Sequence, residues 1–373
     1  MKEREVISIH YNEIALKGKL RSKFESLLIK NIEYSTGIRP DRLQTRLLLE
    51  SGGEGVKRLL LLTPGVSWIS DGKIIPRDFD LLHDNLREII SKEGSDISLD
   101  VKRIDKSFEL TSLDVKLRLA KEFGLALHSG RKKLRIEIMK DSFIINHSIE
   151  RGVGGLPVGS AGKVISLFSG GIDSSVAPFE MMKRGCSVDL LHVYAAKDGE
   201  KAIDSKVGRI AQRISDVYPI KLYFVPFYIF SMKILSINPR YELVMFKRFL
   251  LKLAENLSEA QGYKGIATGD SISQVASQTL DNINAISYGF SIPIFRPLLS
   301  NNKDEIINKA KFYGTYEDAI TRYKDCCSIV SKNPATSVKQ EKVKELEEII
   351  GLDEIVDKTM DMMSVRMFEK KTR

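Results

Sequence analysis

The chain has 373 residues and a mass of 42.0 kDa, which is enough for two or three domains with sizeable cores. With 43% hydrophobic residues, three cysteines and no apolar run of about 20 residues, its composition argues against a membrane span and a disulfide scaffold, and we expect a soluble cytoplasmic protein. The net charge of +9 favours a polyanionic partner such as RNA, because Lys and Arg gain from releasing phosphate counterions.

The first 60 residues predict a small α+β domain. Residues 6–10 and 47–50 are strand-like, and residues 24–34 carry apolar side chains at helical spacing. The turn after the first strand holds basic residues with no acidic residue between them: Lys17, Lys19, Arg21 and Lys23. This turn suits either RNA phosphates or plain solvent, and the local sequence leaves both open.

Residues 61–155 predict a second, locally basic domain. Helices are expected over 81–92 and over 112–123, the latter with Ser112 as N-cap, and strands over 97–101 and 134–138. Residues 101–150 hold 11 Lys and Arg against 7 Asp and Glu. We expect one face of this domain to contact RNA phosphates through Lys102, Arg103, Lys106, Arg131, Lys132 and Lys133.

The glycine-rich stretch 152–159 predicts a linker, after which strands and helices alternate through the domain 156–373. The expected strands are 164–168, 188–193, 222–225 and 265–268, and the expected helices are 176–184, 204–218, 241–259 and 304–313. This alternation predicts an α/β fold with a doubly wound parallel sheet, whose ligands bind at the carboxyl ends of the strands. We expect the tail, residues 338–373, to form a pair of amphipathic helices that packs on the sheet or on a second subunit.

Residues 164–175 predict a strand, a glycine-rich turn and the start of a helix, which together form the local structure of an anion site. Gly170 and Gly171 let the backbone approach a phosphate, and the N–H groups of the helix start point at it. Asp173 is unsuited to direct phosphate contact and is expected to orient the loop or hold Mg²⁺. The pattern lacks the lysine of the Walker loop and the three glycines of the dinucleotide fold. A glycine-rich turn without any ligand is the simpler alternative.

Two further motifs follow. Thr268-Gly-Asp-Ser271 lies at the end of an expected strand. The pair Cys326-Cys327 lies near Lys324 and Lys332, whose charge lowers a thiol pKa; one working thiol is expected, with two buried structural thiols as the alternative.

Together these motifs resemble the tRNA 4-thiouridine synthetases, the ThiI family of tRNA uridine sulfurtransferases. The matching segments, in family order and spacing, are residues 11–19, 154–159, 169–174, 268–280 and 325–327. The resemblance implies an N-terminal ferredoxin-like domain (1–60), a THUMP RNA-binding domain (61–155) and a PP-loop ATP pyrophosphatase domain of the adenine nucleotide alpha hydrolase-like type (156–373).

The resemblance also implies site residues. The loop 169–175 would hold pyrophosphate, with Ser169, Gly170, Gly171, Asp173, Ser174 and Ser175 in contact. The remaining ATP contacts would be Leu167, Phe168, His192, Val193, Gly269 and Gln278, and a family arginine aligns with Lys247, which has Arg248 beside it. Asp173 and Lys303 would support adenylation, and Cys327 would deliver sulfur.

The implied activity is ATP-dependent conversion of the uridine at position eight of tRNA to 4-thiouridine. Mg²⁺ is expected as cofactor, tRNA as partner and a homodimer as assembly. The sequence contains no cysteine after Cys327. We therefore expect no rhodanese domain, and sulfur from a cysteine desulfurase or from free sulfide. The alternatives are another PP-loop ligase acting on a different carbonyl, and a THUMP RNA-binding module without catalysis.

Overall fold

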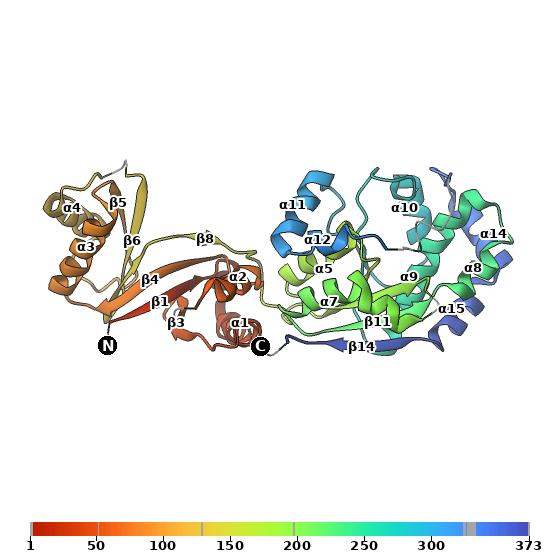
Figure 1. Cartoon of the computed structure of the whole chain (residues 1–373), viewed down its shortest axis with the longest axis horizontal. Helices are drawn as coiled ribbons and strands as arrows, with labels where there is room; N and C mark the ends of the chain where they lie inside the picture. Colours follow the sequence, from red (N-terminus) through yellow and green to blue (C-terminus); the bar gives the residue numbers. More distant parts are fainter. Residues whose placement is uncertain are drawn as a thin grey trace. The chain divides into compact units, whose positions relative to one another are not determined.

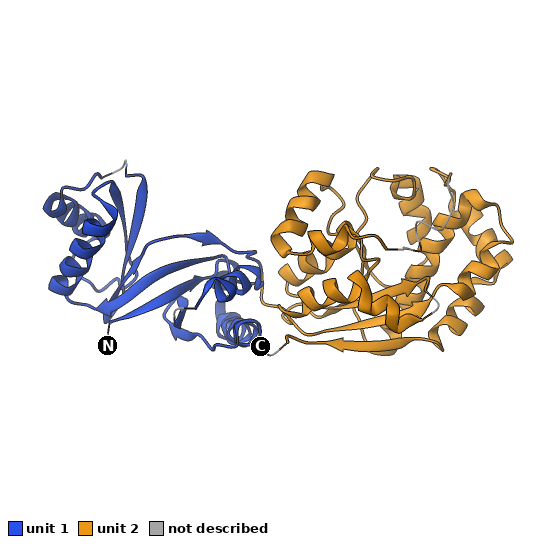
Figure 2. Cartoon of the chain, viewed as in Figure 1, with its two compact units in different colours: residues 1–155 blue, residues 156–373 orange. Residues whose placement is uncertain are grey.

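The computed structural model describes residues 3–50, 52–127, 130–196, 198–323, 326 and 333–371. The chain divides into two compact units, residues 1–155 and 156–373, each with its own sheet and core (Figure 2). Among the described residues, no helix is long and apolar enough to cross a lipid bilayer.

Unit 1 is built on a sheet with the strand order β2-β3-β1-β4-β7-β6-β5, and β8 pairs with β4. Neighbouring strands are antiparallel except β5 and β6, which are parallel. The strands are β1 (Arg4–His10), β2 (Asp41–Leu43), β3 (Arg46–Glu50), β4 (Trp68–Pro76), β5 (Ile97–Arg103), β6 (Lys132–Ile138), β7 (Ser142–Asn146) and β8 (Glu150–Arg151).

The helices of unit 1 are η1 (Glu13–Leu16), η2 (Gly18–Leu20), α1 (Arg21–Thr36), α2 (Glu54–Leu62), α3 (Phe79–Glu93) and α4 (Ser112–Phe123). Thr111, and not Ser112, is the N-cap of α4, because its hydroxyl accepts from Asp114 N–H while the Asp114 carboxylate accepts from Thr111 N–H. The α1 helix ends at Gly37, which takes a left-handed conformation.

Two apolar clusters pack the helices of unit 1 on its sheet. One lies between α1, α2 and strands β1, β3 and β4, and the other between α3, α4 and strands β5 to β7. A smaller third cluster contains Val6, Leu48, Ile74, Met139 and Ile144. The boundary expected between residues 60 and 61 falls within α2, and β4 pairs with β1 along its length. One sheet thus spans both expected N-terminal domains, and their division at that point stays a prediction.

Unit 2 contains the expected doubly wound sheet, with the order β13-β12-β9-β10-β11-β14. The neighbouring strands β11 and β14 are labelled in Figure 1. Its strands are β9 (Lys163–Leu167), β10 (Ser187–Tyr194), β11 (Ile220–Pro226), β12 (Ile266–Ala267), β13 (Ile294–Phe295) and β14 (Ser364–Phe368). All neighbours are parallel except β14, which is antiparallel to β11. The tail therefore contains an edge strand that the helical expectation missed.

The helices of unit 2 are α5 (Ile172–Lys183), α6 (Gly199–Ala202), the π-helix η3 (Ile203–Val207), α7 (Gly208–Ser215), α8 (Tyr228–Ile234), η4 (Pro239–Tyr241), α9 (Glu242–Gln261), η5 (Ala276–Gln278), α10 (Leu280–Ser287), α11 (Lys303–Tyr313), α12 (Tyr316–Ala319), α14 (Gln340–Ile350) and α15 (Leu352–Met360). The α11 helix starts with a capping box of Asn302 and Glu305.

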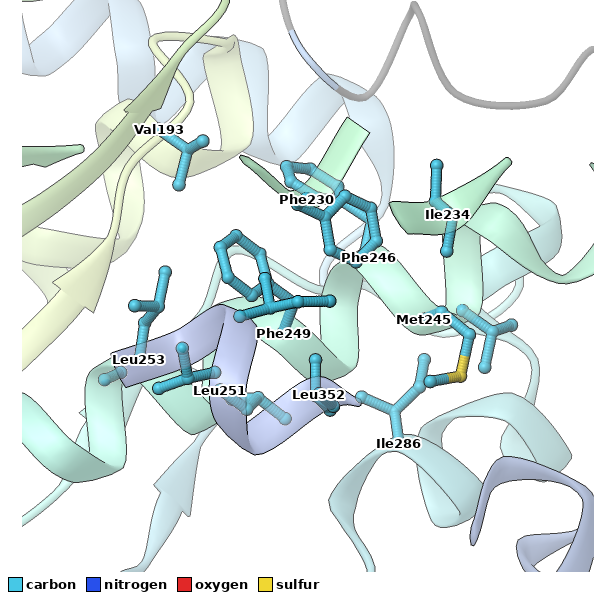
Figure 3. Packing of buried hydrophobic residues seen from close by; sticks show 14 of the residues in the cluster. Val193, Phe230, Ile234, Met245, Phe246, Phe249, Leu251, Leu253, Ile286 and Leu352 are labelled. Carbon is cyan, nitrogen blue, oxygen red and sulfur yellow. The ribbon is translucent and has the colours of Figure 1, made fainter. Parts of the chain in front are cut away.

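The main core of unit 2 lies between one face of the sheet and α8, α9, α14 and α15. Phe230 of α8 packs against Phe246 and Phe249 of α9, with ring centroids 5.5 and 4.8 Å away (Figure 3). Burial of these large rings anchors α9, the helix that carries Lys247 and Arg248.

Candidate active site

A cavity of about 180 Å³ lies where the sheet of unit 2 changes its winding direction, at the carboxyl ends of β9, β10 and β12. Such a switch point is where open α/β sheets bind ligands. Its lining combines apolar and polar side chains: Leu167, Phe168, Ser169, Asp173, Ser174, Leu191, Val193, Phe246, Lys247, Leu250, Leu251, Thr268, Gly269, Asp270, Gln278, Ile286 and Cys326.

The glycine-rich turn joins β9 to α5 at the cavity wall. Gly170 has φ +79°, which an L side chain adopts only with strain, and Gly171 is the N-cap of α5. The Ser174 hydroxyl lies 3.1 Å from the Ser169 hydroxyl and donates to Gly171 O at 3.0 Å. The turn is thereby held in shape, with the unpaired N–H groups of the α5 start available to an anion.

The loop after β12 packs closely against the first turn of α5, with Gly269 at the point of contact. A Cβ on Gly269 would lie 2.9 Å from Asp173 C and 3.0 Å from Ser174 N. Only glycine lets the loop after β12 pack directly on the first turn of α5. This contact explains why the Thr-Gly-Asp motif and the glycine-rich turn form one site.

Asp173 lies between a cation and an amide. Its two carboxylate oxygens accept hydrogen bonds from Lys303 Nζ and Gln274 Nε2, each at 2.8 Å. Lys303 begins α11 and keeps a side-chain exposure of 45%, so its ammonium is accessible from solvent. The arrangement brings together the two residues expected to support adenylation.

Asp270 is a carboxylate with 15% side-chain exposure, which the sequence indicated only as part of the motif 268–271. It accepts from Lys247 Nζ at 2.6 Å and Thr268 Oγ1 at 2.8 Å, and Arg296 Nε lies 3.5 Å away. Burial alone would raise the pKa of this carboxyl, but Lys247, Thr268 and Arg296 outweigh it and lower the pKa to about 2. Its place directly after β12 was the available sequence signal.

The structure decides between the two basic candidates on α9. Lys247 lines the cavity, whereas Arg248 lies about 100° further around the helix and is buried. The Arg248 guanidinium bonds to Glu347 and to the carbonyls of Ile286 and Tyr288. The sequence left open which of Lys247 and Arg248 contacts the nucleotide; the engagement of the Arg248 donors in holding α10 and α14 on α9 favours Lys247.

Two other expected contacts, Ser175 and His192, lie at the edge of the site. The Ser175 hydroxyl is buried and bonds to Ile172 O and Thr315 Oγ1, away from the cavity. Both ring nitrogens of His192 are engaged, with Phe168 O and with the Tyr323 hydroxyl. The side chains of Ser175 and His192 are therefore engaged within the protein, and only their backbone groups can contact a ligand.

The cysteine pair is described in part. Cys326 lines the cavity with 2% exposure, and its thiol donates to Val193 O at 3.3 Å. Cys327, expected to deliver sulfur, lies outside the described residues, as do Lys324 and Lys332.

The basic residues expected to contact RNA lie in unit 1. Lys102, Lys133 and Arg135 gather around Asp100, with nitrogen–oxygen distances of 3.7, 3.7 and 2.8 Å. Burial acts to raise the pKa of the Asp100 carboxyl, and the three cations outweigh it and lower that pKa. Three positive charges around one carboxylate leave this part of the surface basic.

The other basic candidates do not share that face. Because side chains alternate along a strand, Arg103 and Lys132 project to the opposite face from Lys102 and Lys133. The Arg103 guanidinium donates to the carbonyls of Phe108 and Leu110, which is a structural role. The expectation of a single phosphate-binding face is thus corrected for these two residues.

The remaining candidates lie on loops and strand or helix starts. Arg131 and Lys132 pair with Asp96 and Glu93, and Arg21 pairs with Glu25. The Lys17 ammonium lies 5.2 Å from the Phe24 ring centroid. Lys19 and Lys106 have exposed side chains.

The cavity fits a nucleoside triphosphate in its chemistry: an apolar part for a flat base, and a glycine-rich helix start for phosphates. No cluster of three His, Cys, Asp or Glu occurs in the described residues. Mg²⁺ bound to nucleotides needs only one or two carboxylates, and Asp173 at the cavity wall fits that requirement.

Comparison with known families supports one assignment for the whole chain. The family profile described as thiamine biosynthesis protein (ThiI) matches residues 159–352, and the ThiI ferredoxin-like domain matches residues 6–70. A probable tRNA sulfurtransferase of Caldanaerobacter subterraneus is 33% identical over 95% of this chain and 97% of its own length. That of Staphylococcus epidermidis is 31% identical over 95% and 92%.

Solved structures agree with the sequence comparison. A 4-thiouridine synthetase–RNA complex with bound ATP superposes with a TM-score of 0.85 and 29% identity, covering 98% of this chain and 100% of that one. The protein PH1313 from Pyrococcus horikoshii has a TM-score of 0.61 at 19% identity, covering 83% of this chain and 99% of that one, and so shares the fold.

Proposed function

This chain belongs to the ThiI family of tRNA sulfurtransferases, and from that premise we propose that it converts the uridine at position eight of tRNA to 4-thiouridine at the cavity of unit 2. The substrates are ATP, tRNA and a sulfide-level sulfur donor, and the products are AMP and pyrophosphate.

In the proposed complex, ATP binds with its β- and γ-phosphates on the glycine-rich turn 169–175. The α5 start supplies backbone N–H donors and the favourable end of the helix dipole. The adenine then enters the apolar part of the cavity, between Leu191 and the α9 side chains Phe246 and Leu250. Lys247 and Gln278 line the same space and supply polar contacts.

The first chemical step is adenylation. The uridine O4 attacks the α-phosphorus, the bond to the bridging oxygen breaks, pyrophosphate leaves, and the N3 proton passes to solvent. The Lys303 ammonium, held by Asp173, stabilises the charge that develops on the phosphate oxygens. A Mg²⁺ ion held by Asp173 and the nucleotide would offset the charge of the triphosphate.

The second step replaces oxygen by sulfur. A hydrosulfide-level nucleophile attacks C4, the C4–O4 bond breaks, AMP leaves with O4, and N3 regains a proton. Cys327 is proposed to position this nucleophile, because its neighbour Cys326 lines the cavity in which the adenylated base is expected. Where a cysteine desulfurase is the donor, it passes a persulfide sulfur to the Cys327 thiol, and an external dithiol reduces that persulfide, becoming a disulfide and releasing the sulfur as hydrosulfide. The uridine must be turned out of its stack to reach this point.

Unit 1 is proposed to bind tRNA as a THUMP-containing module. The cluster of Lys102, Lys133 and Arg135 supplies charge to neutralise phosphates, and Lys19 adds an exposed cation from the basic turn. A separate sulfur donor, either a cysteine desulfurase or free sulfide, a homodimeric assembly and a cytoplasmic location stay predictions.

The single observation that carries the proposal is the meeting of the glycine-rich turn, the Asp173–Lys303 pair and Cys326 at one cavity. The test uses tRNA labelled with ¹⁸O at O4 of the target uridine, incubated with protein, ATP and sulfide. We expect 4-thiouridine in the digested tRNA and ¹⁸O in the AMP.

Other outcomes separate the alternatives. Pyrophosphate release without tRNA would indicate a ligase for a small molecule. Tight tRNA binding without any pyrophosphate release would indicate a binding module. Formation of 4-thiouridine with unlabelled AMP would contradict attack by O4.

A further inference from the structure

His192 lies at the end of β10 and touches the residue that precedes the glycine-rich turn. The imidazole is 1% exposed, and its Nδ1 lies 2.7 Å from the carbonyl oxygen of Phe168. Because a carbonyl can only accept, Nδ1 carries the proton. The backbone next to Ser169 is thereby tied to the His192 ring.

The other side of the ring faces the segment that leads to the cysteine pair. His192 Nε2 lies 3.0 Å from the Tyr323 hydroxyl, and the two ring centroids are 5.9 Å apart. Burial lowers the pKa of His192 to about 4, so the ring is neutral at pH 7. With the proton on Nδ1, Nε2 accepts, and the Tyr323 hydroxyl is the donor.

The same segment is attached at two more points. Three residues after Tyr323, the Cys326 thiol donates to the carbonyl of Val193, the neighbour of His192. Lys206 lies 5.7 Å from the Tyr323 ring centroid and donates to Ala319 O at 2.9 Å. The Lys206 chain also packs beside the glycine-rich turn, since its Cε is 3.5 Å from where a Cβ on Gly170 would lie.

We propose that the His192–Tyr323 hydrogen bond couples the phosphate-binding turn to Cys326 at the cavity wall, so that Tyr323 has a positioning role in the second, sulfur-transferring step of the reaction. This inference rests on the proposed function. It gives His192 a role as a bridge, and it gives Tyr323 a positioning role in sulfur transfer without contact with the nucleotide.

The two-step chemistry explains why such a bridge matters. After adenylation, water competes with sulfur for C4, and hydrolysis returns uridine and AMP. A displacement of about 1 Å in a reacting group can cost on the order of a hundredfold in rate. Loss of the Tyr323 hydroxyl should therefore leave the rate of adenylation unchanged and raise the fraction of adenylated uridine that is hydrolysed.

The test compares wild type, Tyr323→Phe and the matched control Tyr313→Phe. Tyr313 is a buried tyrosine of unit 2, with its hydroxyl 2.7 Å from Glu180 Oε1 and its ring stacked on Phe179 at 4.3 Å. Pyrophosphate release and 4-thiouridine are measured in the same reaction. For Tyr323→Phe we expect tRNA-dependent pyrophosphate release within about twofold of wild type. The amount of 4-thiouridine formed per pyrophosphate should fall by about fivefold or more, because the loss of one hydrogen bond has about this effect. Tyr313→Phe should keep the wild-type ratio.

A second readout does not depend on activity. Alkylation of Cys326 by N-ethylmaleimide, followed by mass spectrometry, should be several-fold faster in Tyr323→Phe than in wild type. The variant loses the contact with His192 and leaves Cys326 with its hydrogen bond to Val193 O. Cys186, which is buried just before β10, serves as the internal reference, and its alkylation rate should not change.

Three results would overturn the inference while leaving the proposed function intact: an unchanged product ratio in Tyr323→Phe, an equal fall in both products, or an unchanged Cys326 alkylation rate. If wild type itself forms no 4-thiouridine under these conditions, the proposed function fails first.

Discussion

Replacing Gly269 by alanine tests whether the contact between the loop after β12 and α5 shapes the nucleotide site. The added Cβ would lie 2.9, 3.0 and 3.1 Å from backbone atoms of Asp173 and Ser174. Ordinary contacts between such atoms need about 3.5 Å, so the two backbones must separate by roughly 0.5 Å. Overpacking of this kind costs about 1–3 kcal/mol.

Because the phosphates bind to the α5 start, the displaced backbone must return to its original place when ATP binds. The cost then appears in affinity, as a rise in the ATP dissociation constant of about 5- to 150-fold, at 1.4 kcal/mol per factor of ten. Isothermal titration calorimetry with ATP and Mg²⁺ measures it.

The matched control is Gly55→Ala in α2, where an added Cβ meets nothing within 4 Å and φ is not positive. ATP affinity should be unchanged there. An ATP dissociation constant of Gly269→Ala within twofold of wild type would refute the reasoning, because the α5 start would then tolerate the displacement.

Three further predictions follow from the geometry of unit 2. Lys247→Met should weaken ATP binding by about tenfold or more and change the free energy of unfolding little. Arg248→Met should leave the partly buried Glu347 carboxylate without its partner and lower the free energy of unfolding by about 3 kcal/mol; urea titration of both variants measures this. The pKa of His192 is about 4 in the folded chain and 6.5 ordinarily, so the unfolded chain binds the proton first as the pH falls. The contribution of His192 to stability should be constant above pH 6.5 and fall by up to about 1.4 kcal/mol per pH unit down to pH 4. His192→Asn should remove this slope, as urea unfolding midpoints measured against pH will show. Cys327→Ser should bind tRNA and ATP normally and release pyrophosphate, but form no 4-thiouridine by nucleoside mass spectrometry; wild-type thiolation would remove this thiol from the mechanism.

The sequence was most informative where local order alone builds the feature. The run from Val164 to Ser175 contains its own strand, glycines and helix start, so an anion site could be predicted without knowledge of any distant contact. The alternating strands and helices of the second half similarly predicted the parallel sheet, which is confirmed. The edge strand β14 was missed, because a five-residue strand with exposed Val365 and Met367 lacks a buried apolar face.

The choice between adjacent residues was beyond the sequence. Lys247 and Arg248 differ by one position on α9, and only the packing of that helix decides which one enters the cavity. In the same way, Asp270 became a site residue because Lys247 and Arg296 converge on it from distant parts of the chain. Tyr323 was visible beside the cysteine pair, but nothing local connected it with His192, 131 residues earlier.

By itself, the sequence determined which segments can bind a phosphate, which become strands or helices, and where positive charge accumulates, since these depend on neighbouring residues. Only the tertiary structure decided which side chains meet. Long-range contacts are selected by the packing of whole helices and sheets, which no short pattern of residues encodes. The cavity therefore follows from the burial of the α9 rings and the close approach at Gly269 as much as from the motif that first indicated it.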